Sequence, residues 1–321
     1  MIQLSRLALS AIVVSLFLFC SACSKSSLLT AGTASQTQLQ DTTPPVAYQN
    51  RDEAMADYTD NYLGSEYDSV GWTGNTENCD AGTTSDVNKA KVLQRLNYFR
   101  RLVGLPDNVV LVDSLNQKAQ QAALIMKANN QLSHYPTADW HCSTPEGQDG
   151  AANSDIALGA SGPDAVTLYM QDAGVTDLGH RRWILFPSLA SAGDGDTDFS
   201  NALYLIGGFG ARPPMPFVAF PGNGYIPAPL VPQTWSFSVS AADFSQAVIS
   251  VTGPGSIPAN ITTVSLPDGF GDNAISWTMN ALQTNNLTAD QSYQVSVTNV
   301  KIAGQTVNYT YTVQIMAVTA Q

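Results

Sequence analysis

Apolar residues recur at three- and four-residue steps between Ser85 and Gly104, which is the spacing of one helix face. Ser85 is a suitable N-cap with Asp86 in the first turn. Gly104, followed by Pro106, predicts the end of this helix. Its apolar stripe consists of Val87, Ala90, Leu93, Leu96, Phe99 and Val103.

The same spacing predicts two further helices. One starts at Asp113 and fades at Asn129-Asn130, and another covers Pro163–Asp172. Glycines then bound apolar runs typical of strands, of which Ala202–Phe209 is the clearest. This part of the chain is therefore predicted to combine helices with strands.

From Trp235 onward the pattern changes to strict alternation of apolar and polar residues. It is clearest in Trp235–Val239, Tyr293–Val297 and Val307–Val313, and turn clusters rich in glycine and proline separate the segments. Short alternating strands at this spacing predict an Ig-like β-sandwich. The proline-dense stretch Pro213–Pro232 is taken as the boundary, so the predicted fold class is α+β with two domains.

The N-terminus has the architecture of a secretory signal. Arg6 precedes the apolar run Leu7–Phe19, which is too short to span a bilayer, and small residues follow it. Ser21-Ala22-Cys23 resembles a bacterial lipobox, although Cys20 stands where leucine is usual, so Cys23 is the predicted lipidated residue of an extracytoplasmic, membrane-attached protein. The alternatives are a retained membrane anchor, or cleavage followed by release.

Charge excludes some partners. Only 12% of residues are charged, and the net charge is −12. Nucleic acids and anionic lipid surfaces both require a basic face, so neither is an expected partner.

Two cysteines remain beyond the signal, Cys79 and Cys142, and an even pair in an exported protein predicts a disulfide. His141 adjoins Cys142, but adjacent residues rarely both reach one ion, so a metal site here is the weaker interpretation. His141 remains open as a third ligand of a cleft, the alternative being a surface histidine ordered by Trp140.

Six short motifs occur in an order and spacing that resemble the CAP superfamily of cysteine-rich secretory, antigen-5 and pathogenesis-related proteins. They are Asn97-Tyr98-Phe99-Arg100, Gly104-Leu105-Pro106, Val112-Asp113-Ser114-Leu115, Ser133-His134, Ile156-Ala157-Leu158-Gly159 and Gly179-His180-Arg181. The resemblance implies an α-β-α sandwich in which His134 and His180 face each other across a surface cleft.

The chain departs from the family at the two glutamates that complete that cleft. Ser154-Asp155 stands where the family has Glu-Asn, and the third helix carries Gln171 and Asp172. Asp155 and Asp172 could substitute, but each carboxylate sits about 1.5 Å further back than that of a glutamate. That displacement is large for a metal site, where ligand distances hold to about 0.2 Å.

The functional expectations concentrate on His180. With His134 it could bind Zn²⁺ or another divalent cation, with Asp155 or Asp172 as a further ligand. Arg181 and Arg182 would lower the pKa of His180 and keep the imidazole neutral, or bind an anionic ligand. The structural alternative has His180 capping a turn while an arginine pairs with Asp172 or Asp177.

Nucleophilic catalysis has little support, because the sequence has no Gly-x-Ser-x-Gly and both remaining cysteines are expected to be bonded. The run Asp194-Gly195-Asp196-Thr197-Asp198 lacks the glycine and glutamate of an EF-hand, and we interpret it as an acidic turn. Trp235 and Trp277 could bind carbohydrate, but burial in a strand is the commoner role.

The leading hypothesis is a non-catalytic binding protein of the bacterial cell envelope, whose cleft holds a divalent ion, a small ligand or an envelope component. A metal-dependent hydrolase or peptidase and a structural or adhesive protein remain as alternatives. The expected segments are a signal peptide (1–22), a disordered tether (23–47), an N-terminal wrap (48–84), a CAP-like domain (85–212), a proline-rich crossover (213–232) and an Ig-like β-sandwich (233–321).

Overall fold

The computed structural model describes residues 40–45, 47–255, 261, 263–280 and 282–318. The predicted signal peptide, Cys23 and most of the predicted tether lie outside these residues. Within them, no helix combines the length and apolar character that a membrane span requires.

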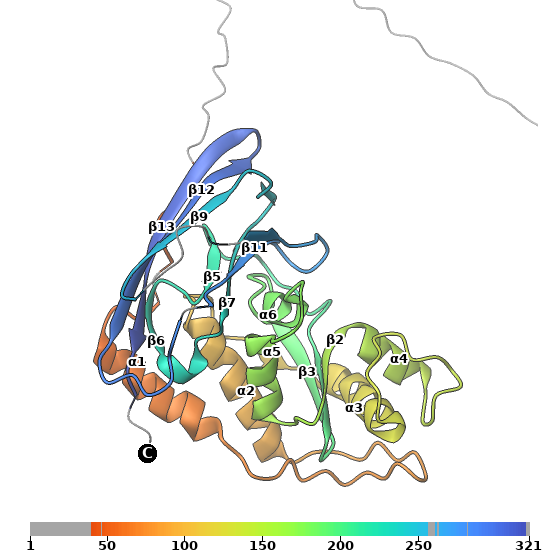
Figure 1. Cartoon of the computed structure of the whole chain (residues 1–321). Coiled ribbons are helices and arrows are strands. Elements are labelled where there is room, and N and C mark those ends of the chain that lie inside the picture. Colours follow the sequence, from red (N-terminus) through yellow and green to blue (C-terminus); the bar gives the residue numbers. More distant parts are fainter. Residues whose placement is uncertain (1–39, 46, 256–260, 262, 281, 319–321) are drawn as a thin grey trace, which may run out of the picture. The chain divides into compact units, whose positions relative to one another are not determined.

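The first part of the fold is a three-layer α-β-α sandwich, as predicted (Figure 1). Its sheet has the strand order β1-β3-β4-β2. These strands are β1 (Val110–Leu111), β2 (Ser154–Leu158), β3 (Ser191–Asp196) and β4 (Ser200–Tyr204). The helices are α2 (Asp86–Arg101), α3 (Asp113–Asn129), α4 (Pro145–Ala152), α5 (Pro163–Gln171) and α6 (Gly179–Ile184).

The helix boundaries follow from local chemistry. The Ser85 hydroxyl accepts the backbone N–H of Asn88 at 3.0 Å and so caps α2. Thr144 caps α4 in the same way, with Pro145 at the first helical position. Helix α3 begins at the predicted Asp113, and Asn130 ends it in the left-handed region with φ of 47°.

Two glycines allow α3 to lie very close to the sheet. A Cβ atom on Gly193 would come within 2.3 Å of the backbone of Leu115, and one on Gly195 within 2.2 Å of Gln120 N. Strand β3 therefore presents bare backbone to α3, while its side chains at Asp194 and Asp196 point to the other face.

The second part consists of two sheets, with strand orders β10-β11-β7-β5 and β6-β13-β12-β8, where β9 also pairs with β12. The strands are β5 (Val218–Phe220), β6 (Gly224–Pro227), β7 (Thr234–Val239), β8 (Ala242–Asp243), β9 (Val248–Thr252), β10 (Thr263–Ser265), β11 (Asn273–Thr278), β12 (Gln291–Ile302) and β13 (Gln305–Met316). A 3-10 turn, Ala228–Leu230, follows β6.

The stretch predicted as a proline-rich crossover contributes a strand to each of these sheets. Strand β5 pairs with β7, and β6 pairs in parallel with β13. Each lies at the end of its strand order, where prolines are tolerated. The prolines therefore flank edge strands instead of forming an open connection.

Aromatic side chains join the two sheets into a sandwich. The ring of Phe237 on β7 lies 5.1 Å from that of Tyr309 on β13, and Trp235 lies 5.9 Å from Tyr293 on β12. Trp235 and Trp277 are at most 1% exposed, so both belong to the core and neither offers a surface for carbohydrate. The same cluster of buried residues continues into α2 through Phe99, so the core crosses the predicted domain boundary.

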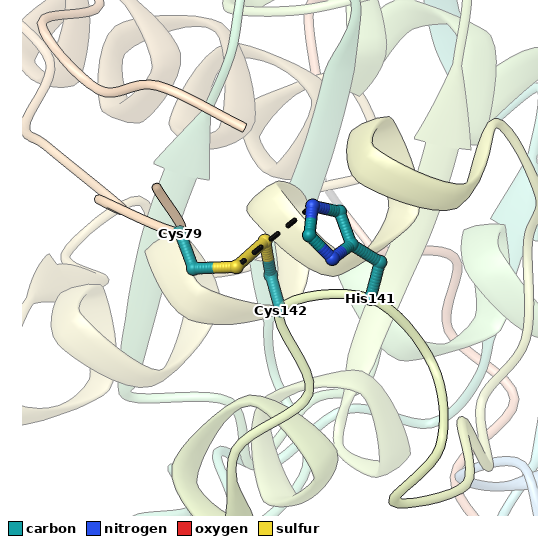
Figure 2. Close-up of side chains that lie close together, drawn as sticks. All are labelled: Cys79, His141 and Cys142. Carbon is teal, nitrogen blue, oxygen red and sulfur yellow. Dashed lines mark hydrogen bonds between the residues drawn. A yellow bond between two sulfur atoms is a disulfide. The ribbon is translucent and has the colours of Figure 1, made fainter. Parts of the chain in front are cut away.

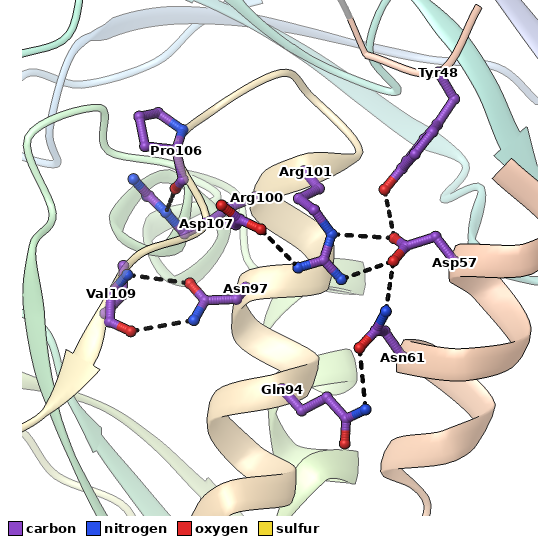
Figure 3. A network of polar contacts seen from close by, with 10 residues as sticks. All are labelled: Tyr48, Asp57, Asn61, Gln94, Asn97, Arg100, Arg101, Pro106, Asp107 and Val109. Carbon is purple, nitrogen blue, oxygen red and sulfur yellow. Dashed lines mark hydrogen bonds and ion pairs between the residues drawn. The ribbon is translucent and has the colours of Figure 1, made fainter. Parts of the chain in front are cut away.

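Residues 48–84 are more helical than a simple wrap. Helix α1 (Arg51–Asp57) continues into a π-helical turn, Tyr58–Tyr62, and a 3-10 turn, Leu63–Ser65. The carboxylate of Asp57 accepts hydrogen bonds from Tyr48, Asn61 and Arg101, and so fastens α1 to α2 (Figure 3). Arg51 pairs with Asp290 at 2.8 Å, which ties the same segment to the β-sandwich.

Candidate functional site

The Asn-x-x-Arg motif of α2 holds loops in place. The amide of Asn97 exchanges hydrogen bonds with both backbone groups of Val109 (Figure 3). Arg100 is fully buried and donates to the carbonyl oxygens of Pro106 and Ile184 at 2.9 and 2.8 Å. Both residues therefore position the connection to β1 and the end of α6.

Asp172 and His180 do meet, at the junction of α5 and α6. Asp172 ends α5 in the left-handed region with φ of 49°. This bend turns its carboxylate toward α6, where it accepts from His180 Nδ1 at 2.7 Å and from Arg181 N at 3.1 Å. Asp172 thus caps the short helix α6 and fixes the orientation of the imidazole.

The imidazole of His180 is also packed on one face. Its ring stacks on Tyr169 at 5.2 Å, and its side chain is 21% exposed. Burial lowers its pKa, but the hydrogen bond with Asp172 and the charges of Asp155 and Asp172 outweigh that effect and raise the pKa to about 9. His180 is therefore protonated at neutral pH, and a metal ion would have to displace that proton in order to bind the ring.

Arg181 and Arg182 were expected to lower the pKa of His180, but that pKa is raised, and both guanidinium groups are bonded elsewhere. Arg181 is fully buried and donates to the carbonyl oxygens of Met170, Gln171 and Thr234, all within 2.9 Å. Arg182 points to the carbonyl oxygens of Asp177 and Asp272. Both arginines hold structure together, so Arg181 is not available to an external ligand.

His134 and Asp155 lie in different surroundings. His134 is exposed, with Nδ1 2.9 Å from the carbonyl oxygen of Ala151, whereas Nδ1 of His180 bonds Asp172. Asp155 is 3% exposed, and its Oδ2 has no hydrogen-bond partner among the residues that the structure describes. Burial raises the pKa of Asp155 well above its usual range, which makes its carboxyl a poorer ligand for a cation. Ser154, at the family's glutamate position, is buried as well.

The available donors therefore do not fit the two-histidine, two-glutamate set of the family. In the described part of the chain, one group of three metal-type side chains converges, and it consists of Cys79, His141 and Cys142. Cys79 and Cys142 form the predicted disulfide. A divalent ion at His134 and His180 stays a prediction.

A catalytic arrangement around these histidines is also incomplete. Within the described ranges, no serine, threonine or cysteine side chain shares a hydrogen bond with His134 or His180. An Asp–His pair without a nucleophile or a neutral base lacks two parts of a hydrolytic site.

A polar hollow of about 700 Å³ lies elsewhere, between residues 81–84 and the helices α2, α3 and α4. Charges of both signs line it at Lys89, Lys118, Asp86, Asp113 and Glu146. Side-chain amides line it at Asn116, Gln117, Gln120 and Gln121. Pattern reasoning missed this hollow because its residues lie on the polar faces of helices, which are ordinarily solvated.

The predicted acidic turn 194–198 is wrong for Asp194, which lines this hollow, and for Asp196, since both lie on strand β3; the connection to β4 follows at 197–199. Asp194 and Asp196 are 0% exposed on β3, and Asn201 donates to both at 3.1 and 2.8 Å. Burial raises the pKa of both carboxyls. The alternation with glycine was the available signal, since it is typical of a strand with one face against a helix.

Comparison with known proteins gives one result. Residues 93–204 match the family model described as CAP, the cysteine-rich secretory protein family. No curated protein and no solved structure matches the chain.

Proposed function

Residues 93–204 make this chain a CAP-domain protein of the cysteine-rich secretory family, and on that premise we propose that it is a non-catalytic binding protein of the bacterial cell envelope. The observation that carries the proposal is the polar hollow of about 700 Å³ on the α2–α3 side of the domain. Its volume falls within the range of small-molecule sites.

The lining of the hollow defines the class of ligand. Side-chain amides both donate and accept hydrogen bonds, so they suit hydroxyl and amide groups on a ligand. Lysine ammonium groups and carboxylates in the same walls suit a ligand that carries both charges. An N-acetylated sugar that bears a short peptide has all of these groups, and we propose an envelope component of this class.

Blocking the hollow tests the proposal. Gln117 is exposed and lines the hollow, so Gln117→Trp should weaken binding of a muramyl peptide at least tenfold by calorimetry. Gln131→Trp adds the same bulk at an exposed position outside the lining and should leave binding unchanged. Equal affinities of the two variants for the muramyl peptide would reject the hollow as its binding site. If the wild type does not bind the peptide, a structural or adhesive role is favoured.

The proposed location in the envelope is supported by the apolar run Leu7–Phe19 followed by Cys23, and by the disulfide, which is typical of oxidising compartments. Mass spectrometry of the protein extracted from membranes should give an acylated N-terminal Cys23. An unmodified chain that begins at another residue would reject lipid attachment.

The hydrolase alternative has one specific observation in its favour, the Asp172–His180 hydrogen bond of 2.7 Å. A histidine oriented by an aspartate is one part of many hydrolytic sites. Its raised pKa makes His180 a poor general base at neutral pH, which is why we favour binding.

A further inference from the structure

The disulfide region brings three potential metal ligands together. The sulfur atoms of Cys79 and Cys142 and Nε2 of His141 lie within 4.8 Å of one another, and Nε2 is 4.0 Å from the sulfur of Cys79 (Figure 2). Zn–S bonds of about 2.3 Å and Zn–N bonds of about 2.0 Å in a tetrahedron place ligand atoms roughly 3.5–3.8 Å apart. We propose that reduction of this disulfide creates a Zn²⁺ site formed by Cys79, Cys142 and His141.

A thiol reductant supplies the two electrons that this conversion requires. Two reductant thiols transfer two electrons to the S–S bond, which leaves two protein thiols and one reductant disulfide. Zn²⁺ then displaces the two thiol protons and binds both thiolates together with the lone pair of Nε2. The imidazole proton moves to Nδ1, and three protein ligands leave the fourth position to water.

The side chains of His141 and Cys142 converge, although the two residues are adjacent, because the backbone at Cys142 is left-handed. Cys142 has φ of 60° and Cys79 has φ of 56°, both in the left-handed region that non-glycine residues seldom occupy. The carbonyl oxygen of Thr76 lies 2.9 Å from His141 Nε2 and 3.3 Å from the sulfur of Cys142, so both side chains point to the same spot. The sequence argument against a shared ion therefore does not hold here.

Hydrogen bonds that do not involve sulfur hold both segments in place. Cys79 lies in a hairpin closed by the backbone pair of Asn75 and Asp80, at 2.8 and 2.9 Å. On the other side, the amide of Asn129 at the end of α3 bonds both backbone groups of His141, at 3.0 and 2.9 Å. Breaking the S–S bond leaves these contacts intact, so the three ligands remain close to one another.

Access to the site is direct, since Cys79 and His141 are both exposed. A reductant can therefore reach one sulfur, and a hydrated ion can reach the imidazole. This site lies outside the lining of the polar hollow and does not depend on the proposed ligand.

The test uses the full chain, reduced with a phosphine so that no added thiol competes for the metal. Co²⁺ bound to the reduced protein should show thiolate-to-cobalt charge transfer and tetrahedral visible bands, and Zn²⁺ should remove both. The oxidised chain should show neither. His141→Ala should weaken Zn²⁺ binding at least tenfold, whereas Tyr135→Ala, which removes an exposed ring outside this group of ligands, should leave it unchanged.

Two results would overturn the proposal. One is a reduced chain that binds Zn²⁺ no more tightly than the Cys79→Ser/Cys142→Ser double variant. The other is a His141→Ala variant with wild-type affinity, since the imidazole would then not be a ligand. Near-ultraviolet circular dichroism should show that the reduced chain keeps its fold, and unfolding on reduction would count against the proposal.

Discussion

Replacing Arg181 by methionine should destabilise the protein by about 3 kcal/mol or more. The guanidinium is 0% exposed and donates to the carbonyl oxygens of Met170, Gln171 and Thr234. Burial lowers its pKa to about 10, so it still carries its charge at neutral pH. Methionine fills similar space but removes the donors that Arg181 supplies to these three carbonyl oxygens, of which that of Met170 is buried.

Urea unfolding measures this effect, as a lower midpoint with an unchanged slope. Arg51→Met is the matched control, because Arg51 is 38% exposed and its ion pair with Asp290 lies at the surface. Such pairs contribute at most about 1 kcal/mol, so the control should unfold close to the wild type. Equal losses for the two variants would contradict a structural role specific to Arg181.

The position of Arg181 explains why sequence reasoning mistook a structural residue for a ligand-binding one. Two of its acceptors are carbonyls at the end of α5, and the third, on Thr234, lies 53 residues further along the chain. No local pattern reports a contact of that kind. Because Arg181 is a basic residue beside His180, the sequence suggested a binding site. In the structure, Arg181 joins α5 to strand β7.

Helices and alternating strands were predictable because their signals are local. Ser85 caps α2, as its side chain indicates, and α3 begins at the predicted Asp113, an acidic residue in its first turn. Helices α1 and α4 were missed, since Arg51–Asp57 and Pro145–Ala152 have short polar sequences without an apolar stripe. Their stability comes from tertiary contacts such as the Asp57–Arg101 ion pair.

The candidate site was predictable only in part, for a similar reason. Cys79 and Cys142 form the expected disulfide, and His180 does meet Asp172. The burial of Asp155 and the exposure of His134 depend on how strands and helices pack in three dimensions. Neither property can be obtained from the spacing of motifs.

The second large effect concerns the titration of His180, whose folded pKa of about 9 exceeds the usual 6.5. The folded state therefore holds this proton more tightly than the unfolded chain does. Its stabilising contribution is complete below pH 6.5 and is lost as the pH rises through 9. A shift of this size corresponds to roughly 1–3 kcal/mol, which should appear as a difference in pH dependence between the wild type and His180→Gln.

The source of the raised pKa can be separated by two isosteric variants and an NMR titration of the imidazole. Burial raises the pKa of Asp155 and so weakens the charge that it presents to His180, whereas Asp172 bonds Nδ1 directly at 2.7 Å, so we expect Asp172 to supply the larger part of the effect. Asp172→Asn should therefore lower the pKa of His180 by at least one unit, while Asp155→Asn should lower it less. A larger fall in the pKa of His180 in Asp155→Asn than in Asp172→Asn would mean that Asp155 is ionised in the folded protein. If His180 is neutral at pH 7 in both the wild type and Asp172→Asn, it could again serve as a general base or a metal ligand.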